Sequence, residues 1–492
     1  MADPEIELPP SLEDNSPKKD VTSLRYESEQ DSSPDETESR STGTTIQDPI
    51  QWEYLTFEST LPRPSRLLEP AQDKGPPEEP DLKQYESPFN WSPGRKRFIT
   101  WLSCIATTVT AYAAGSYTSG DAQMEQYFGV SRVAITVGVT TFTTGFAIAP
   151  MVLAPFSEIN GRRPMFVITG IMYVLLQLCC ALTRSYGGML VARFFKGVFS
   201  STFSTMVGGV VSDIYHAEDR NTAMALFSGA ALFGTGLGPL VSGFIATYTT
   251  WRWIFYLQVI TCGVVQIMVI LFFKETRGSV LLSRKAKKLN QYYDALEDAG
   301  YFGLDVPCSS DPSKTVSMRI RWKVKSDEER ASLVKSIGIS LYRPFYLLFT
   351  EPVVFFFSLW ISFAWAVLYM TFSAVPLVFE TSHNFTLDQS GAVFSAISIA
   401  AILSTIVAIL VDRWSKKRFP EINKTPEGRL YIACVQSALL PIGLFWFGWT
   451  SFKSVPWIVP ALAIGCATMG IFSVYLAVFN YLADTYLSLI HI

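Results

Sequence analysis

The sequence predicts an all-α membrane protein with about ten transmembrane helices. Of its 492 residues, 49% are hydrophobic and only 17% are charged, and the mean hydropathy is +0.24. Long apolar runs recur from residue 97 onwards, and basic residues gather in the connections between them. A soluble chain of this length is rarely so apolar. The formal net charge of −3 gives no support for nucleic-acid binding.

The expected spans follow from hydropathy, because a helix needs about 20 apolar residues to cross a bilayer. They cover residues 97–118, 133–155, 164–183, 188–211, 222–247, 253–273, 353–379, 389–411, 428–450 and 456–483. The basic cluster Arg95-Lys96-Arg97 precedes the first span and predicts a cytosolic N-terminus. Residues 95–273 then form a first half of six helices, and residues 353–486 supply four helices of a second half.

Two long polar segments flank the first half. Residues 1–94 are rich in Ser, Pro, Glu and Asp and are expected to form a disordered cytosolic tail, with Trp52–Phe57 as a possible docking segment. Residues 274–352 form a cytosolic connection. Within it, the basic run Leu281–Leu289 has helical spacing. This helix is expected to lie against anionic lipid or the ends of the bundle, or to serve as a solvated linker.

A short charged turn separates the second and third spans. Glu158, Gly161, Arg162 and Arg163 stand there between two apolar runs. Gly161 permits a tight turn, and the arginines mark a cytosolic face. Glu158 is expected to pair with these arginines or to face a helix N-terminus. The run that begins with Asp412 and Arg413, after the eighth span, repeats the pattern of an acid followed by basic residues.

Two of the spans carry residues that are unusual in a transmembrane helix. In the fourth, Arg193 and Lys196 share one helical face, and each cation costs ~2.5–3.5 kcal/mol in hydrocarbon. Arg193 is expected to face a wet cavity or a structural ion pair, and Lys196 either does the same or extends its amine toward the surface. In the fifth, Gly234, Gly238 and Pro239 predict a close helix crossing with a kink.

The acidic residues near the spans differ in their expected environment. Asp121 and Asp213 fall near helix ends and are expected to be solvated, whereas Glu380 and Asp484 stay candidates for proton binding. An arginine does not release its proton near neutral pH. If Arg193 takes part in proton transfer, it must therefore act through the protonation of a neighbouring group.

Together the Glu158–Arg163 turn, the Gly234–Gly243 run and Trp251-Arg252-Trp253 resemble the fungal drug:proton antiporters of the major facilitator superfamily. The resemblance implies two pseudo-repeated six-helix halves, with the second half incomplete and residues 487–492 departing from the family pattern. It further implies roles for three sets of residues. These are Arg193 and Asp484 in proton coupling; Glu158, Gly161, Arg162, Arg163, Asp412, Arg413, Gly234, Gly238 and Pro239 in gating; and Trp365, Tyr369, Phe372, Asn480 and Tyr481 in a substrate cavity.

The implied function is proton-coupled export of amphipathic or cationic small molecules by alternating access. The expected partners are a small-molecule substrate, protons and the lipid bilayer, with no nucleic acid, cofactor or metal. The chain is expected to be a monomer in the plasma membrane rather than the vacuolar one. Polyamine or nutrient transport by the same fold, and a non-transporting receptor or scaffold, are the alternatives. An enzyme is not expected, because the three histidines have no catalytic or metal-binding spacing.

Overall fold

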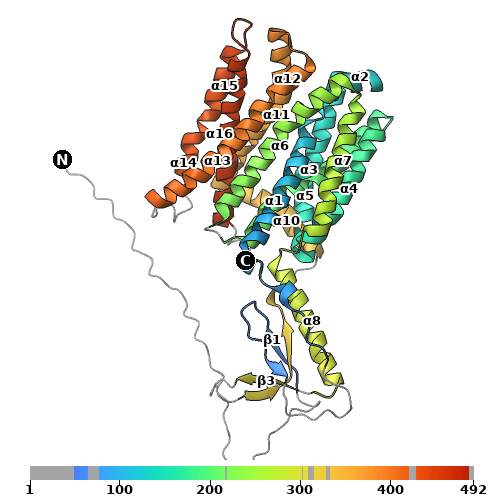
Figure 1. Cartoon of the computed structure of the whole chain (residues 1–492), viewed down its shortest axis with the longest axis vertical. Helices are drawn as coiled ribbons and strands as arrows, with labels where there is room; N and C mark the ends of the chain where they lie inside the picture. Colours follow the sequence, from blue (N-terminus) through green and yellow to red (C-terminus); the bar gives the residue numbers. More distant parts are fainter. Residues whose placement is uncertain are drawn as a thin grey trace, which may run out of the picture. The chain divides into compact units, whose positions relative to one another are not determined.

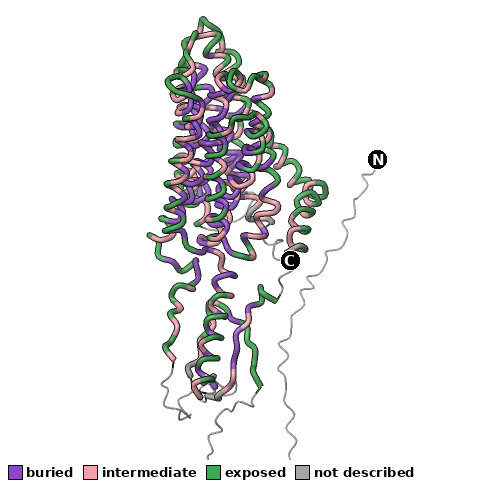
Figure 2. The backbone as a smooth tube through the Cα atoms, turned by 90° about the vertical axis from the view of Figure 1, so that its right-hand side faces the viewer, coloured by how far each residue is buried: buried purple, intermediate pink, exposed green. Residues whose placement is uncertain are grey.

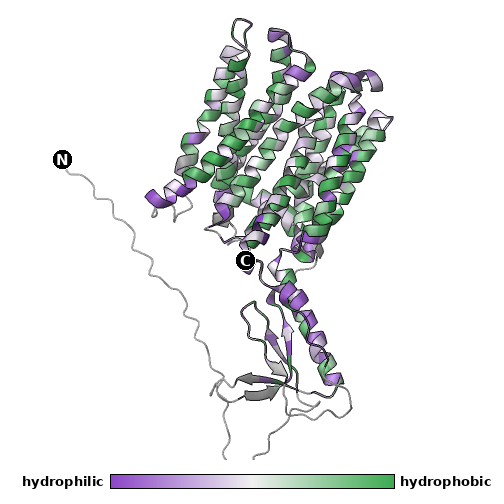
Figure 3. Cartoon of the chain, in the orientation of Figure 1, coloured by the Kyte–Doolittle hydropathy of each residue, from purple (hydrophilic) through white to green (hydrophobic). Residues whose placement is uncertain are grey.

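The computed structural model describes residues 49–64, 77–216, 219–301, 303–307, 315–328, 333–419 and 428–486. Residues 1–48 and 487–492, on which two of our expectations fall, lie outside these ranges. Figure 1 shows long helices that run side by side, and Figure 3 shows apolar residues along most of their length. Figure 2 shows the buried residues gathered inside this bundle.

The first half of the bundle contains six long helices, as expected. They are α1 (Pro93–Gly115), α3 (Arg132–Asn160), α4 (Arg162–Leu182), α5 (Tyr186–Ile214), α6 (Arg220–Tyr248) and α7 (Trp251–Phe272). A short helix, α2 (Asp121–Phe128), follows α1 through the turn η3 (Thr118–Gly120). Ser131 caps α3 and Ser185 caps α5, each by accepting a hydrogen bond from a backbone N–H three residues later.

The fourth of these helices, α5, differs from the others in polarity. Nine helical segments of the described chain are long and apolar enough to cross a membrane, and α5 is not among them, although it spans 29 residues. Arg193, Lys196 and a run of Ser and Thr lower its hydropathy. It packs against α1, α3 and α4. The ten expected helices are therefore present, but α5 depends on its neighbours to shield its polar groups.

The second half contributes the remaining long helices. They are α11 (Pro352–His383), α12 (Leu387–Val393), α13 (Ser395–Arg418), α14 (Gly428–Ser437), α15 (Leu439–Thr450) and α16 (Ile458–Tyr486). Of these, α12 with α13 forms one apolar span, and the apolar span Ala433–Thr450 covers the second half of α14 and all of α15. The four spans expected between residues 353 and 483 thus correspond to helices of the structure. Their shared core is almost wholly apolar, with Phe372, Phe379 and Phe394 among its buried residues.

Helix α6 joins the two halves. It packs against α1 on one side and against α12, α13 and α16 on the other, and Figure 1 shows it at the boundary between the two groups of helices. Glycines permit this approach: a Cβ on Gly236 would lie 2.7 Å from Ser398 Oγ, and one on Gly243 would lie 3.2 Å from the Cα of Gly391.

We name the two ends of the bundle after Gly161 and Trp251, one residue at each end. The Gly161 end carries the turn between α3 and α4, the last residues of α5, α7 and α13, and the first residues of α1 and α6. The Trp251 end carries the turn between α6 and α7 and the first residues of α5.

A small α/β unit is formed by segments on either side of the first half. Strand β1 (Gln51–Tyr54) pairs in parallel with β5 (Ile320–Lys323), while β2 (Arg63–Pro64), β3 (Leu304–Pro307) and β4 (Thr315–Met318) form a second sheet. Helix α8 (Gly278–Asp298) covers them, and its residues Ala286, Leu289, Tyr293 and Leu296 are buried together with Leu55 and Trp322. The short elements η1 (Lys83–Tyr85), η2 (Pro88–Asn90) and α9 (Lys325–Glu328) and the 18-residue helix α10 (Leu333–Thr350) complete the described chain.

This unit corrects one expectation about the polar segments. Residues 49–64, expected to belong to a disordered tail, pair with the connection between the halves because Leu55 inserts into its core. The apolar face of α8 packs against these strands, and α8 also contacts α3 at the end of the bundle, one of the positions expected for it. The docking segment considered at Trp52–Phe57 overlaps β1, but no strand was expected there, because all four side chains of β1 are exposed and backbone pairing holds the strand.

Charged groups also support this unit. Arg319 lies 2.8 Å and Arg321 lies 3.0 Å from the same carboxylate oxygen of Glu297 in α8. Partial burial alone would raise the pKa of Glu297, but the hydrogen bonds and charges of the two arginines outweigh it and lower the pKa. The carboxylate therefore stays ionised and ties α8 to the strand region.

Replacing Leu55 tests whether the α/β unit depends on its core. Leu55 is 2% exposed, and truncating a buried leucine to alanine costs about 2–5 kcal/mol. We expect Leu55→Ala to speed tryptic cleavage within the basic run of α8, measured by limited proteolysis of the purified chain. Trp52→Ala, at a side chain that is 57% exposed, is the control. Equal cleavage rates for the two variants would contradict this packing.

Candidate functional site

Two buried cations lie inside the first half. The side chains of Arg193 and Lys196 in α5 are fully buried. Arg193 Nε donates a hydrogen bond to the carbonyl oxygen of Gly138 in α3 at 3.1 Å, and its guanidinium carbon lies 4.0 Å from the ring centroid of Tyr117. Its Nη1 and Nη2 have no hydrogen-bond partner in the described part of the chain. One carbonyl group and aromatic rings therefore hold this guanidinium.

Lys196 starts a chain of hydrogen bonds that links three helices. Its Nζ donates to Oε1 of Gln258 in α7 at 3.1 Å. Gln258 Nε2 donates in turn to Oγ of Ser116, which directly follows α1, and Ser116 Oγ donates to the carbonyl oxygen of Tyr112 at 2.8 Å. The Lys196 amine also lies 5.4 Å from the ring centroid of Phe255. The environment of Lys196 is thus tied to α1 and α7.

The surroundings of the two cations offer little compensation for their charge. Among the residues that the structure describes, neither Arg193 nor Lys196 forms a salt bridge. Asp121 lies within electrostatic range of Arg193 but makes no ion pair with it. An unpaired buried charge costs several kcal/mol, and a cation–π contact returns only about 0.5–2 kcal/mol. The structure therefore holds more positive charge here than its contacts neutralise.

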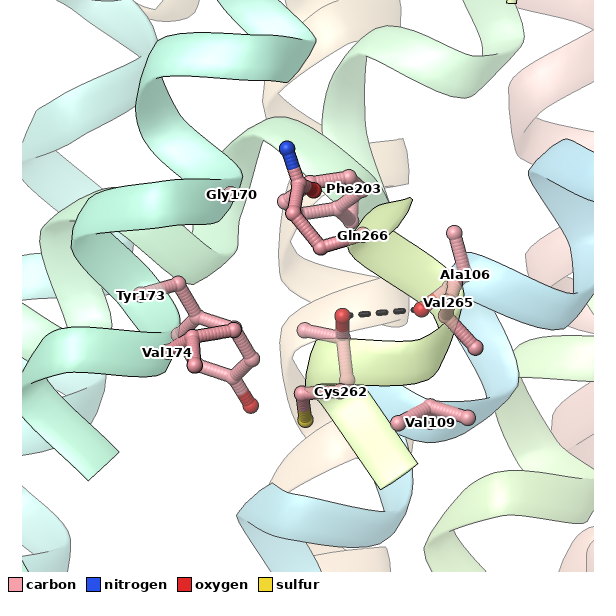
Figure 4. Close-up of a pocket in the computed structure, with 10 residues that line it drawn as sticks. Ala106, Val109, Gly170, Tyr173, Val174, Phe203, Cys262, Val265 and Gln266 are labelled. Carbon is pink, nitrogen blue, oxygen red and sulfur yellow. Dashed lines mark hydrogen bonds between the residues drawn. The ribbon is translucent and has the colours of Figure 1, made fainter. Parts of the chain in front are cut away.

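A small void lies beside this cluster. It is lined by α1, α4, α5 and α7, and Figure 4 shows Tyr173 of α4 on one side and Cys262 of α7 on another. Its volume is about 20 Å³, the room that one water molecule needs. Tyr173 and Cys262 also lie near the two cations, Tyr173 beside Arg193 and Cys262 beside Lys196. The void is too small for a drug-sized ligand.

The Gly161 turn is held by a carboxylate from a distant part of the sequence. Gly161 adopts a φ of +99°, and a Cβ there would lie within 2.2 Å of a Glu275 oxygen. Glu275, which follows α7, accepts hydrogen bonds from the backbone N–H groups of Arg162 at 2.8 Å and Arg163 at 3.3 Å. It therefore caps the positive end of α4, a favourable position for a carboxylate.

The Arg162 side chain joins a second acid. Its Nε lies 3.2 Å from Oδ2 of Asp213 at the end of α5, and its Nη1 donates to Ser157 Oγ at 2.6 Å. Arg277 Nη1 lies 3.2 Å from the other oxygen of Asp213. The side chains of Arg162 and Asp213 are each only 7% exposed. Asp213 is therefore paired and buried, which corrects the expectation of a solvated carboxylate.

Glu158 does not form the ion pair with Arg162 or Arg163 that was expected of it. Its side chain is exposed, and no ion pair joins it to Arg162 or Arg163 within the described ranges. The partners are Asp213 and Glu275 because the end of α5 and the end of α7 lie at the same end of the bundle as the turn. The up-and-down order of the spans implies that the ends of the fourth and sixth spans lie beside this turn. Asp213 and Glu275, which stand at those span ends, could have been identified as partners in this way.

The acid-and-basic run that begins with Asp412 and Arg413 forms contacts that differ from those of the Gly161 turn. Asp412 of α13 forms an ion pair with Lys416 at 3.0 Å and accepts a hydrogen bond from Asn221 of α6 at 2.6 Å. Asn480 of α16 donates to Asn221 at 2.7 Å. Asp412 and Asn480, expected in a gate and in a cavity, thus meet through Asn221, which the sequence did not single out. Arg413 is exposed.

The glycines of α6 make the expected close crossing. A Cβ on Gly234 would lie 2.3 Å from the carbonyl oxygen of Thr108, and one on Gly238 would lie 2.7 Å from that of Tyr112, both in α1. Pro239 lies inside α6 and faces Gly115. The backbones of α1 and α6 therefore touch without intervening side chains.

The aromatic residues expected in a cavity divide into two groups. Tyr369 lies within electrostatic range of Arg193, and the ring of the buried Phe372 would meet a Cβ on Gly115 at 3.3 Å, so these two residues of α11 face the first half. Trp365 and Tyr481 pack within the second half, Trp365 against Tyr475 at 5.6 Å and Tyr481 against Phe357 at 5.1 Å. The side chain of Asp484 lies outside the described residues.

A bundle of long apolar helices in two halves, with charged groups buried in its interior, is the architecture of a multi-pass membrane protein. The sequence profile of the Major Facilitator Superfamily matches residues 98–488. The chain belongs to this family, whose members move small molecules across membranes.

Similar proteins agree with this assignment. The transporter paaT of Penicillium rubens is 32% identical, over 82% of this chain and 69% of its own length. The multidrug transporter mdrA of Aspergillus fumigatus is also 32% identical, over 81% of this chain and 62% of its own length. The solved proton:xylose symporter XylE matches the fold with a TM-score of 0.54 at 15% identity, over 80% of this chain and 82% of its own.

The two curated relatives, paaT and mdrA, are longer than the chain described here. The chain spans from 60% to 70% of the length of eight curated fungal relatives, paaT and mdrA among them. The resemblance to fungal members of the family, expected from the motifs, is confirmed by these matches.

Replacing Asp213 tests whether Arg162 pairs with Asp213, as the structure shows, or with Glu158, as the sequence predicted. Asp213→Asn leaves Arg162 buried without its counter-charge, which costs about 3–5 kcal/mol. We expect a lower thermal unfolding midpoint of the purified protein, followed by intrinsic fluorescence. Glu158→Gln, at an exposed acid, is the matched control and leaves the midpoint unchanged. A larger loss for Glu158→Gln would show that the expected pairing was correct after all.

The α1–α6 crossing is tested by adding a side chain to it. In Gly234→Val the new carbons clash with the backbone of Thr108, so the two helices cannot approach. We expect loss of the monodisperse peak in size-exclusion chromatography of a fluorescent fusion. Gly263→Val in α7, where a Cβ would meet nothing within 4 Å, is the control and retains the peak. Survival of both variants would mean that the crossing is not close.

Proposed function

We propose that the chain exports amphipathic or cationic small molecules in exchange for protons, by alternating access of its two halves. The observation that carries this proposal is the position of α6. Its Gly234–Pro239 segment lies against the backbone of α1, while the same helix packs against α12, α13 and α16 of the second half. Relatives named as multidrug transporters or efflux pumps support export as the direction.

Basic residues support a cytosolic Gly161 end. Arg95–Arg97, Arg162 with Arg163, and Lys416–Arg418 all lie at this end. The positive-inside rule favours the cytosol for such residues. We infer that the N-terminus is cytosolic and that the protein works in the plasma membrane.

Two clusters at the Gly161 end are suited to latch a cytosolic gate. Arg162, Asp213 and Arg277 tie α4 to the ends of α5 and α7. Asn221, Asp412 and Asn480 tie α6 of the first half to α13 and α16 of the second. The second cluster crosses between the halves, so its hydrogen bonds must break when the halves part at this end. Gly161 would keep the turn tight during this motion.

The residues that face between the halves favour an amphipathic substrate. Tyr369 and Phe372 of α11 offer aromatic surface toward α1 and α5, which suits flat molecules and cations through stacking and cation–π contacts. Trp365, Asn480 and Tyr481 extend the candidate surface along α11 and α16, and Asp484 stays a candidate for proton binding. A polyamine site would call for several acids here.

Dye efflux tests the proposal. The chain is expressed in yeast that lacks its own drug exporters, and efflux of a fluorescent cationic dye is measured with glucose, with and without a protonophore. We expect faster efflux than in cells without the chain, and the protonophore removes the difference. Arg193→Gln should be made and inserted at normal levels but should not drive efflux, because the buried guanidinium is lost.

Other outcomes favour the alternative functions. Proton-driven uptake of a labelled polyamine or nutrient, with no dye efflux, would reverse the direction that we propose. A chain that inserts normally but moves neither dye nor nutrient would favour a receptor or scaffold.

A further inference from the structure

We propose that Lys196 carries the exchanged proton, binding it when the site opens to the outside and releasing it when the site opens to the cytosol. This inference rests on the proposed exporter function and names the group that couples it. It departs from the sequence-based expectation, in which Arg193 and Asp484 were the coupling residues.

The position of Lys196 is suitable for access from both sides. It lies ten residues after Tyr186, the first residue of α5 at the Trp251 end. At 1.5 Å per residue this is about 15 Å, half of a hydrocarbon core of about 30 Å. A group at this depth can face either side when the packing around it changes.

The hydrogen bonding of Lys196 fits an amine that alternates between two forms. An ammonium group has three donors, whereas a neutral amine has two donors and one acceptor. In the described residues the Lys196 amine has one hydrogen-bond acceptor, Oε1 of Gln258 at 3.1 Å. The arrangement seen in this structure therefore satisfies a neutral amine more fully than an ammonium group.

The fixed charge beside Lys196 is positive, like that of its own ammonium group. Arg193 lies one turn earlier on the same helix and repels a second positive charge. Cys180 of α4 and Cys262 of α7 are the titratable groups that face it from the neighbouring helices, and α3 presents the ring of Phe142 at 5.8 Å. Asp121, the nearby carboxylate, interacts with Arg193. No acid of the described chain forms an ion pair that would keep the ammonium charged.

Lysine and arginine have different roles in this pair. Arg193 cannot release a proton in a protein, so it serves as a fixed positive charge. Lys196 can release one, and a buried lysine does so readily. Gln258 connects Lys196 to Ser116 at the end of α1, and α1 packs on α6. Protonation of Lys196 is thereby linked to the helices that move when the halves rock.

The exchange balances one proton against one molecule of cargo. On the cytosolic side the ammonium gives its proton to water and becomes a neutral amine, and a cationic cargo then binds without repulsion. On the outside the amine takes a proton from water, and the restored positive charge repels the cargo. Each cycle moves one proton inward and one cargo molecule outward.

Two variants of Lys196 distinguish a proton carrier from a structural residue. Lys196→Gln is permanently neutral and Lys196→Arg is permanently charged. The affinity of the full chain for a fluorescent cationic dye is measured in detergent from low to high pH. For the wild type we expect affinity to fall by about tenfold per pH unit on the acidic side of the transition, since one proton competes with one cargo molecule. Lys453→Gln, at an exposed lysine, is the control and behaves as the wild type.

The two variants should move in opposite directions. Lys196→Gln should bind the dye at every pH with the high affinity that the wild type has in alkaline solution. Lys196→Arg should bind the dye at every pH with the low affinity that the wild type has in acid. In proteoliposomes both should lose uptake driven by a pH gradient and keep exchange of labelled for unlabelled dye.

Three results would overturn the inference. A shift of both variants in the same direction would indicate a structural role for Lys196. Gradient-driven transport that persists in Lys196→Arg would place the proton on another group, with the exporter function intact. A wild type that neither binds nor exchanges any dye would instead contradict the proposed function and this inference with it.

Discussion

The first half is organised by the need to keep charged groups away from lipid. Within hydrocarbon every polar group must find its partners inside the protein. Helix α5 carries two fully buried cations, Arg193 and Lys196, and α1, α3 and α4 pack around it. Gly138 supplies its carbonyl oxygen, Gln258 its amide oxygen and Tyr117 its ring. The arrangement of the remaining helices of this half follows from enclosing α5.

The second half is held together differently. Its core consists mainly of apolar side chains, with single polar contacts such as Ser390 with Glu380 at the Trp251 end and Ser473 of α16 with Gln436 of α14. The halves meet along α6, where small residues permit close backbone approach and a few amides form hydrogen bonds at the Gly161 end. Such an interface combines tight packing with few polar bonds. It can therefore open at one end without exposing unpaired charges.

Hydropathy and turn residues were enough to predict the helices, since span length and the Gly161 turn are local properties of the sequence. Ion-pair partners were not predictable in the same way, because Asp213 and Glu275 reach Arg162 and its backbone only after α4, α5 and α7 have packed. Asn221 was missed because an asparagine at a helix start has many ordinary explanations. Strand β1 was missed because its pairing partner, β5, is distant in the chain. The roles of Asp484 and of the cavity aromatics stay predictions.

The pairing of β1 with β5 brings together the chain segments that precede and follow the six helices of the first half. The segments that enter and leave this half therefore lie next to each other, as the two termini of many domains do. The entropy of closing a loop grows only slowly with its length, so enclosing six helices in this way costs little more than enclosing two. A six-helix block with adjoining ends can be duplicated, inserted or circularly permuted with few broken contacts. The geometry suits a fold that is built from repeated halves.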